Sequence, residues 1–225
     1  MGDAPSRLAR RPQLADEVAA HLRALIMSGR LRPGERVRLD DVAEELGVSI
    51  TPVREALLTL RGEDMVELEP RRGYVVAPLS KQDILDVFAL QGDIAGELAA
   101  RATARLTPRH LAELSTVDRR LARVRRSADI ENLEFEFHRT INRLAGARKL
   151  SWMLHAATRY TPARFLSSDP AWRATMRSDH EALLAAFTAG DPGTARAVMR
   201  RHFSDGADRL VKHLDDLGIW REPQI

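Results

Sequence analysis

The chain has 225 residues, of which 44% are hydrophobic and 30% charged, and its formal net charge is only +3. This length and composition are typical of a globular protein with one or two domains, and the small net charge does not by itself indicate a nucleic-acid partner. The absence of cysteine excludes disulfides and thiolate chemistry and fits a reducing compartment. No apolar run approaches the roughly 18 residues that span a bilayer, and no export signal is evident. We therefore expect a cytoplasmic protein with no membrane partner.

The first third of the chain carries the pattern of three helices followed by a hairpin. Apolar residues recur at helical spacing within residues 13–29, and a loop with a Pro-Gly turn follows. A second helix is expected over residues 40–46 and a third from Thr51, its candidate cap, with Pro52 in the first turn. The segment VELEPRRGYVVAP, residues 66–78, predicts two short strands around a basic turn.

The second and third of these helices have the spacing of a helix-turn-helix. Ala43 is a small residue where two helices would touch, Gly47 lies in the turn, and Val53 would pack the third helix on the second. With a helix before it and a hairpin after it, this motif predicts a winged helix-turn-helix domain over residues 13–78. Residues 1–12 are expected to form a flexible arm.

After residue 80 the strand signals vanish, and amphipathic helical segments separated by prolines and glycines follow. We expect these helices near residues 81–104, 108–126, 129–145, 149–166, 178–189 and 192–216. The pattern predicts an all-helical bundle over residues 79–220. The expected fold class is therefore mainly α, with an amino-terminal winged helix-turn-helix, a small β-hairpin wing and a helical bundle.

The run LGVSITPVREAL, with the wing sequence PRRGYVV, resembles the GntR family of bacterial transcription regulators. The helical remainder, with segments such as EFEFHRTI and SDHEALLAAFTAGD, resembles the FCD effector domain of the FadR-like branch. The resemblance implies a ligand-responsive transcriptional repressor with no enzymatic activity. It also implies a homodimer on a pseudo-palindromic double-stranded DNA operator, with one winged helix per half-site.

In a winged helix, the amino-terminal end of the third helix enters a major groove. Ser49 and Thr51 can donate there to phosphates or base edges, and Arg54 can form a forked contact with a guanine or a phosphate. Arg72 and Gly73 form the expected wing tip, where glycine allows close approach and the arginine reaches the minor groove or the DNA backbone.

Two further positions bear on DNA recognition. Arg38 and its neighbouring loop arginines are candidates for phosphate contacts, although ordinary solvated surface is an equal alternative for a loose arginine cluster. The family usually has an arginine where this chain has Ile50. One base contact is therefore either missing or replaced by an apolar contact with a thymine methyl group.

The segment EFEFHRTI places Glu134 four residues before His138, so on a helix the two side chains share one face. The FCD resemblance implies an interior metal held by an Asp-x-x-x-His pair and two later histidines. Glu134 and His138 match the pair, with glutamate in place of the usual aspartate, and His180 and His202 match the later positions. Such ligands suit a divalent metal, zinc first, with nickel or manganese also open. The alternatives are a three-histidine site with Glu134 outside it, or a hydrogen-bonded pair without metal.

The resemblance further implies a small carboxylate effector near the metal. The family often shows Arg-x-x-x-Glu near the start of this domain, but these positions are Gln91 and Ala95 here, so a cationic anchor is missing. Gln91 and Arg159 are the candidate effector contacts, although an ordinary surface residue is an equal alternative for Arg159. Two other functions remain open: a regulator for which the metal itself is the signal, and a metal-dependent hydrolase fused to a DNA-binding module. No separate general base or nucleophile is evident for the hydrolase.

Overall fold

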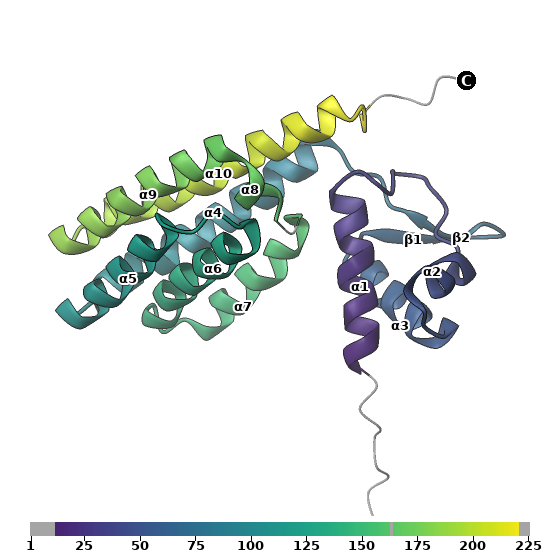
Figure 1. The fold of residues 1–225 in the computed structure, drawn as a ribbon, viewed down its shortest axis with the longest axis horizontal. Helices are drawn as coiled ribbons and strands as arrows, with labels where there is room; N and C mark the ends of the chain where they lie inside the picture. The colour runs from purple at the N-terminus through teal and green to yellow at the C-terminus, as the bar shows by residue number, and fades with distance from the viewer. Residues whose placement is uncertain (1–11, 163, 221–225) are drawn as a thin grey trace, which may run out of the picture. The chain divides into compact units, whose positions relative to one another are not determined.

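The computed structural model describes residues 12–162 and 164–220, and the chain divides into two compact units between Leu79 and Ser80. Most of the predicted arm, residues 1–11, lies outside the described residues. The first unit contains helices α1 (Pro12–Met27), α2 (Leu39–Leu46) and α3 (Ile50–Gly62) and strands β1 (Val66–Glu69) and β2 (Gly73–Val76) (Figure 1). The strands form an antiparallel hairpin in which Val66 pairs with Val76 and Glu69 with Gly73.

The turn between α2 and α3 forms as the residue spacing predicts. Gly47 ends α2 with φ of 63°, a left-handed conformation that glycine adopts without steric strain, and its N–H bonds to the carbonyl groups of Ala43 and Glu44. Ala43 and Val53 are buried where the two helices meet. The helical cap was predicted wrongly at Thr51. The extended residue before α3 is Ser49, so Thr51 already lies in the first turn of that helix.

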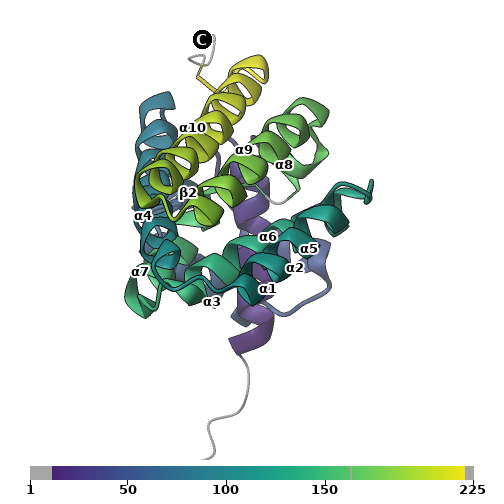
Figure 2. The same cartoon turned by 90° about the vertical axis from the view of Figure 1, so that its left-hand side faces the viewer.

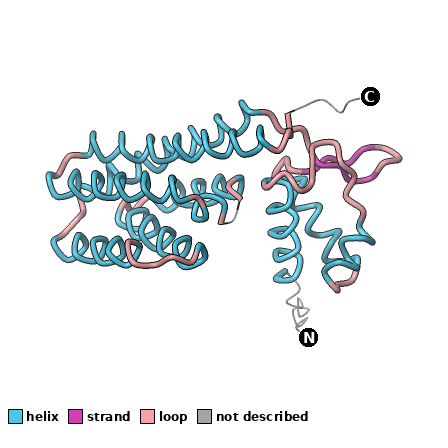
Figure 3. Tube along the Cα trace, turned by 45° about the horizontal axis from the view of Figure 1, so that its top comes forward, coloured by secondary structure: helices cyan, strands magenta, loops and turns pink. Residues whose placement is uncertain are grey.

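The second unit is a helical bundle. Its elements are α4 (Lys81–Thr103), α5 (Pro108–Leu121), α6 (Ser127–Leu144), α7 (Arg148–Ala157), the 3₁₀ turn η1 (Thr158–Tyr160), α8 (Phe165–Ser168), α9 (Pro170–Ala189) and α10 (Pro192–Asp216). Figure 2 shows α4, α10 and α9 from another side, and Figure 3 shows helices and loops throughout the described part of this unit. The expected fold class, mainly α with a small hairpin wing, is confirmed.

Helices α4 and α10 pack unusually closely because small residues line their contact. Gly92 faces Arg200 and Gly96 faces Arg196, so the two helices run antiparallel. A Cβ atom at Gly96 would lie 2.9 Å from the carbonyl oxygen of Arg196, closer than non-bonded atoms approach. Around this pair the core is built from fully buried side chains such as Leu98. The close contact fixes the face of α10 that points into the bundle.

Several helix boundaries differ from the prediction, and the helix expected over residues 108–126 already ends at Leu121. The single helix expected over 149–166 is wrong, because α7 ends at Ala157 and η1 and α8 follow. Pro162 accounts for the break, since a proline disfavours the helical conformation in the residue before it, and Thr161 is extended. Helix α9 begins at Pro170 rather than at residue 178, with Asp169 as its cap through a 2.8 Å bond from the Ala171 N–H.

Among residues 12–162 and 164–220, no helix has both the length and the apolar character that a bilayer crossing requires.

Candidate metal centre and nucleic-acid interface

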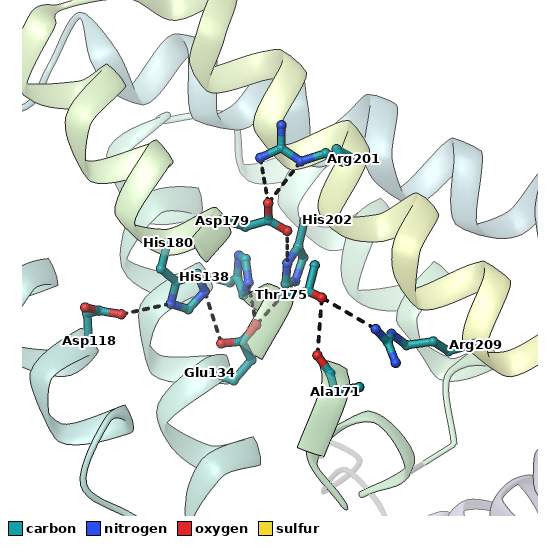
Figure 4. Close-up of polar contacts among 10 residues, drawn as sticks. All are labelled: Asp118, Glu134, His138, Ala171, Thr175, Asp179, His180, Arg201, His202 and Arg209. Carbon is teal, nitrogen blue, oxygen red and sulfur yellow. Dashed lines mark hydrogen bonds and ion pairs between the residues drawn. The ribbon is translucent and has the colours of Figure 1, made fainter. Parts of the chain in front are cut away.

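Three helices of the bundle bring the four predicted ligands to one interior point (Figure 4). Helix α6 supplies Glu134 and His138, α9 supplies His180 and α10 supplies His202. His138 Nε2 lies 3.0 Å and His202 Nε2 3.3 Å from Oε1 of Glu134, while His180 Nε2 lies 3.2 Å from Oε2. Ligand atoms of Glu134, His138 and His202 all lie within 4.8 Å of one another. His180 contacts this group through Oε2, the second carboxylate oxygen of Glu134.

Two aspartates lie beside the Nδ1 atoms of His180 and His202, whose Nε2 atoms lie near Glu134. Asp118 Oδ1 on α5 lies 3.3 Å from Nδ1 of His180, and Asp179 Oδ2 lies 3.4 Å from Nδ1 of His202. Arg201 in turn donates to Asp179 Oδ1 over 2.6 and 3.1 Å. A carboxylate on Nδ1 orients the ring and leaves Nε2 free to ligate, which is the usual arrangement behind a metal-bound histidine. Neither aspartate could be identified from the sequence, because each contact joins different helices and has no fixed spacing.

Without a metal, protonated imidazoles balance the buried charge of Glu134. Burial opposes the charge on Glu134, but His180 and His138 outweigh it and hold the pKa of Glu134 well below its usual value. Burial lowers the pKa of His138. Burial also opposes the charge on His202, yet its hydrogen bonds with Asp179 and Glu134 raise its pKa to about 9. The carboxylate is therefore ionised in the interior, where its charge needs compensation.

The donor set fits the metal that the FCD resemblance implies. Glu134 Oε2 and both ring nitrogens of His180 are buried and have no hydrogen bond of good geometry, although charged groups lie within ion-pair distance. Buried polar atoms are rarely left in this state. A cation held by Glu134 and the imidazole Nε2 atoms would satisfy Oε2 and Nε2. Nitrogen and carboxylate ligands of this kind suit zinc, nickel or manganese.

A titration experiment follows from the raised pKa of His202. Without metal, protonated His202 contributes stability that is present below its usual pKa of 6.5 and lost as the pH rises through about 9. Metal binding needs the neutral ring, so metal affinity rises over the same window. We expect zinc to raise the melting temperature more at pH 8.5 than at pH 6.5, at constant buffered free zinc. A stabilisation that does not grow with pH would contradict this assignment of His202.

A cavity of about 640 Å³ adjoins the candidate metal centre. Glu134, His138 and His202 line it together with Gln91, so the cluster is accessible from the cavity. Arg159, the predicted effector contact, is exposed on η1 and does not line the cavity, although Thr158 and Thr161 of the same segment do. The arginines that do line the cavity are Arg139, Arg143 and Arg148. No pattern in the sequence indicated any of these three arginines.

The predicted DNA contacts lie on one part of the first unit. Ser49, Thr51 and Arg54 are exposed at the amino-terminal end of α3. A hollow of about 500 Å³ beside them is lined by residues that include Arg36, Arg38, Ile50, Arg54 and Gly73. Ile50 is 41% exposed, so this position presents an apolar side chain to the outside. Asp40 and Asp41 also line the hollow, so it carries both signs of charge, and its three arginines are available for contacts with the DNA backbone.

The wing tip differs in detail from the expected one. Pro70, Arg71 and Arg72 form the turn between the paired residues Glu69 and Gly73. The side chain of Arg72 is bound within the protein, since its guanidinium lies 2.7 Å from Glu69 Oε2 and 3.2 Å from the Gly34 carbonyl oxygen. Arg71 is exposed and has φ of 66°, a left-handed conformation that costs a non-glycine residue about 1 kcal/mol. The sequence RR does not distinguish the two arginines, whereas the turn geometry does.

Both units have known relatives. Residues 14–76 match the bacterial regulatory proteins of the gntR family, and residues 86–205 match the FCD domain. An HTH-type transcriptional regulator of Mycobacterium tuberculosis is 32% identical over 81% of this chain and 75% of its own length. The HTH-type transcriptional repressor GlaR of Escherichia coli is 26% identical over 79% of this chain and 86% of its own length. The structure of McbR/YncC from E. coli is 26% identical, with a TM-score of 0.66 over 88% of this chain and 97% of that one.

The two matches coincide with the two units of the structure. The gntR match covers the described helix-turn-helix and hairpin, and the FCD match begins within α4 and ends within α10. These families and relatives are regulators, which confirms that the chain acts on transcription rather than as an enzyme. The chain therefore belongs to the GntR family of bacterial regulatory proteins and is a DNA-binding transcriptional regulator with an FCD domain.

Proposed function

We propose that this regulator is a repressor whose operator affinity is set by an organic carboxylate bound beside a divalent metal in the FCD domain. The observation that carries the proposal is the convergence of Glu134, His138, His180 and His202 at one point, where all but His180 line the 640 Å³ cavity. The name of the relative GlaR, a repressor, supports the sign of regulation. Residues 13–78 would bind DNA, and residues 79–220 would bind the effector and form a homodimer in the cytoplasm.

The metal would be held by Glu134, His138 and His202, with His180 as the fourth ligand and zinc as the best match to this donor set. Bound there, it would supply a positive charge and an open coordination position for a carboxylate at the cavity wall. Asp118 and Asp179 would keep the rings of His180 and His202 in place. Arg139 and Arg148 would add positive charge at the cavity, in the role first assigned to Arg159.

The DNA contacts would follow the geometry of the exposed end of α3. Arg54 would read a guanine or bind a phosphate, while Ser49, Thr51 and Arg38 would contact phosphates or base edges. Ile50 would add an apolar contact with a thymine methyl group. In a homodimer, two such surfaces would occupy successive half-sites of a pseudo-palindromic operator. Effector binding would favour a dimer geometry in which the two recognition helices no longer match the two half-sites of the operator.

Replacing Arg71, the strained residue of the wing, should change stability and operator affinity in opposite directions. Arg71→Gly removes the left-handed strain, so we expect the protein to gain up to about 1 kcal/mol of stability. The same change removes an exposed arginine from the wing tip, so operator affinity should fall by about fivefold or more. Thermal unfolding and a fluorescence anisotropy titration measure the two effects.

Arg72→Ala is the matched control, because it breaks only the exposed ion pair with Glu69 and the bond to the Gly34 carbonyl. Its operator affinity should change less than that of Arg71→Gly. The assignment of Arg71 to the wing contact is wrong if Arg72→Ala shows the larger loss.

The regulatory test is the response of operator binding to metal and effector. Chelation, zinc alone, and zinc with a panel of carboxylates are compared in the same anisotropy titration. Release by a carboxylate only in the presence of metal supports the proposal. Release by metal alone would replace it with a metal sensor, and no response to either would contradict it.

A further inference from the structure

One buried amide at the cavity uses its hydrogen-bond donor but not its acceptor. Gln91 on α4 is 0% exposed and lines the cavity. Its Nε2 atom donates to the carbonyl oxygen of Ala157 over 3.3 Å, whereas its Oε1 atom has no hydrogen-bond partner within the described residues. Because a carbonyl oxygen can only accept, the amide nitrogen must be the atom that faces Ala157. The orientation of the amide is thereby fixed, and Oε1 remains available to a ligand.

An available amide oxygen selects the chemistry of the ligand beside it. A buried acceptor without a donor is unfavourable, so a ligand with an O–H or N–H group gains a hydrogen bond at Oε1. A second carboxylate on the ligand would gain no hydrogen bond at Oε1, because both groups are acceptors and repel each other. Gln91 also carries no positive charge that could attract the carboxylate. This side of the cavity therefore favours a neutral donor group over an anion.

The remaining surface of the cavity favours an apolar body. Phe88, Leu154, Leu166, Trp172 and Phe203 line it, and Phe135 is 56% exposed at its edge. A volume of about 640 Å³ lies within the range of sites that enclose drug-sized ligands. A three- or four-carbon acid would leave most of these aromatic and aliphatic side chains without contact. The positive groups are at other lining positions, among them Arg139 and Arg148.

We propose that the effector is a monocarboxylate with an aromatic or branched apolar body and a hydroxyl group that donates to Oε1 of Gln91. This inference rests on the proposed function, since it assigns the chemical class of the ligand that the same site binds. The role of Gln91 is then distinct from that of the positive groups, such as Arg139 and Arg148, that would bind the carboxylate. Gln91 determines specificity through one neutral hydrogen bond, and the carboxylate is bound elsewhere in the cavity.

Three matched probes test the proposal by isothermal titration calorimetry on the protein as purified. They are 3-phenyllactate, 3-phenylpropionate, which lacks only the hydroxyl, and benzylsuccinate, which carries a carboxymethyl group in its place and so a second carboxylate. We expect 3-phenyllactate to bind about tenfold more tightly than 3-phenylpropionate, as one neutral hydrogen bond provides, and benzylsuccinate to bind most weakly. Equal affinity for the first two probes, tightest binding of benzylsuccinate, or no binding of any probe at millimolar concentration would each overturn the proposal.

Gln91→Met keeps the length of the side chain and removes the amide oxygen. In this variant the ratio of the affinities for 3-phenyllactate and 3-phenylpropionate should fall to about one. A ratio unchanged in Gln91→Met would overturn the role of Gln91. Operator binding measured on the same samples separates this inference from the proposed function. If 3-phenyllactate shows the expected selectivity but never changes operator affinity, the ligand class stands and the proposed regulation fails.

Discussion

His202→Ala is expected to abolish the stabilisation of the protein by zinc. A ligand present at 1,000 times its dissociation constant stabilises a folded protein by about 4 kcal/mol, which corresponds to roughly 10 °C for a chain of this size. His202 is one of three residues whose ligand atoms lie within 4.8 Å, and its Nδ1 is oriented by Asp179. Without its ring, the cluster loses a donor on α10, and the melting temperature should no longer respond to zinc.

His213→Ala provides the matched control, because His213 lies on the same helix and packs against Phe165 rather than against the cluster. Differential scanning fluorimetry with and without buffered zinc compares the two variants with the wild type. The wild type and His213→Ala should show the same zinc-dependent shift, even if their melting temperatures differ. A full shift in His202→Ala would remove this residue from the ligand set.

Arg54→Ala is expected to weaken operator binding by about 10- to 100-fold. A forked contact between an arginine and a guanine contributes roughly 1–3 kcal/mol, and Arg54 is exposed at the end of α3 that faces a major groove in a winged helix. The substitution removes no buried contact, so the fold should be unaffected. An operator selected from a random DNA pool with the wild-type protein serves as the ligand in an anisotropy titration.

The comparison for this second prediction is Arg61→Ala. Arg61 is also exposed and lies in the last turn of α3, away from the amino-terminal end. Both substitutions remove one positive charge, so a difference between them reports on position rather than on charge. Equal affinities for the two variants would contradict the assignment of Arg54 to base or backbone recognition.

Local patterns in the sequence were sufficient for the winged helix. The positions of Ala43, Gly47 and Val53 depend on the geometry of one turn, and the structure buries Ala43 and Val53 as expected. The pair Glu134 and His138 was also predictable, since residues four apart on a helix share a face. In each case the contacts join residues that are close in the chain.

Contacts between helices could not be predicted in the same way. Asp118 and Asp179 meet imidazole rings that belong to other helices, and no spacing in the sequence connects them. Arg159 was named as a candidate effector contact because the cationic anchor usual in the family is missing at Gln91. The break near Pro162 changes the direction of the chain, and the arginine lies outside the cavity lining. Only tertiary packing brings Arg139 and Arg148 to that cavity.

The most direct test of the metal-dependent account is the metal content of the protein purified without an affinity tag or chelator. Elemental analysis compares the wild type with the double variant His138→Ala, His180→Ala. The account predicts about one equivalent of a divalent metal per chain in the wild type and none in the variant. A wild-type protein that holds no metal even after reconstitution would contradict the account, and Glu134 and His138 would then be a buried hydrogen-bonded pair.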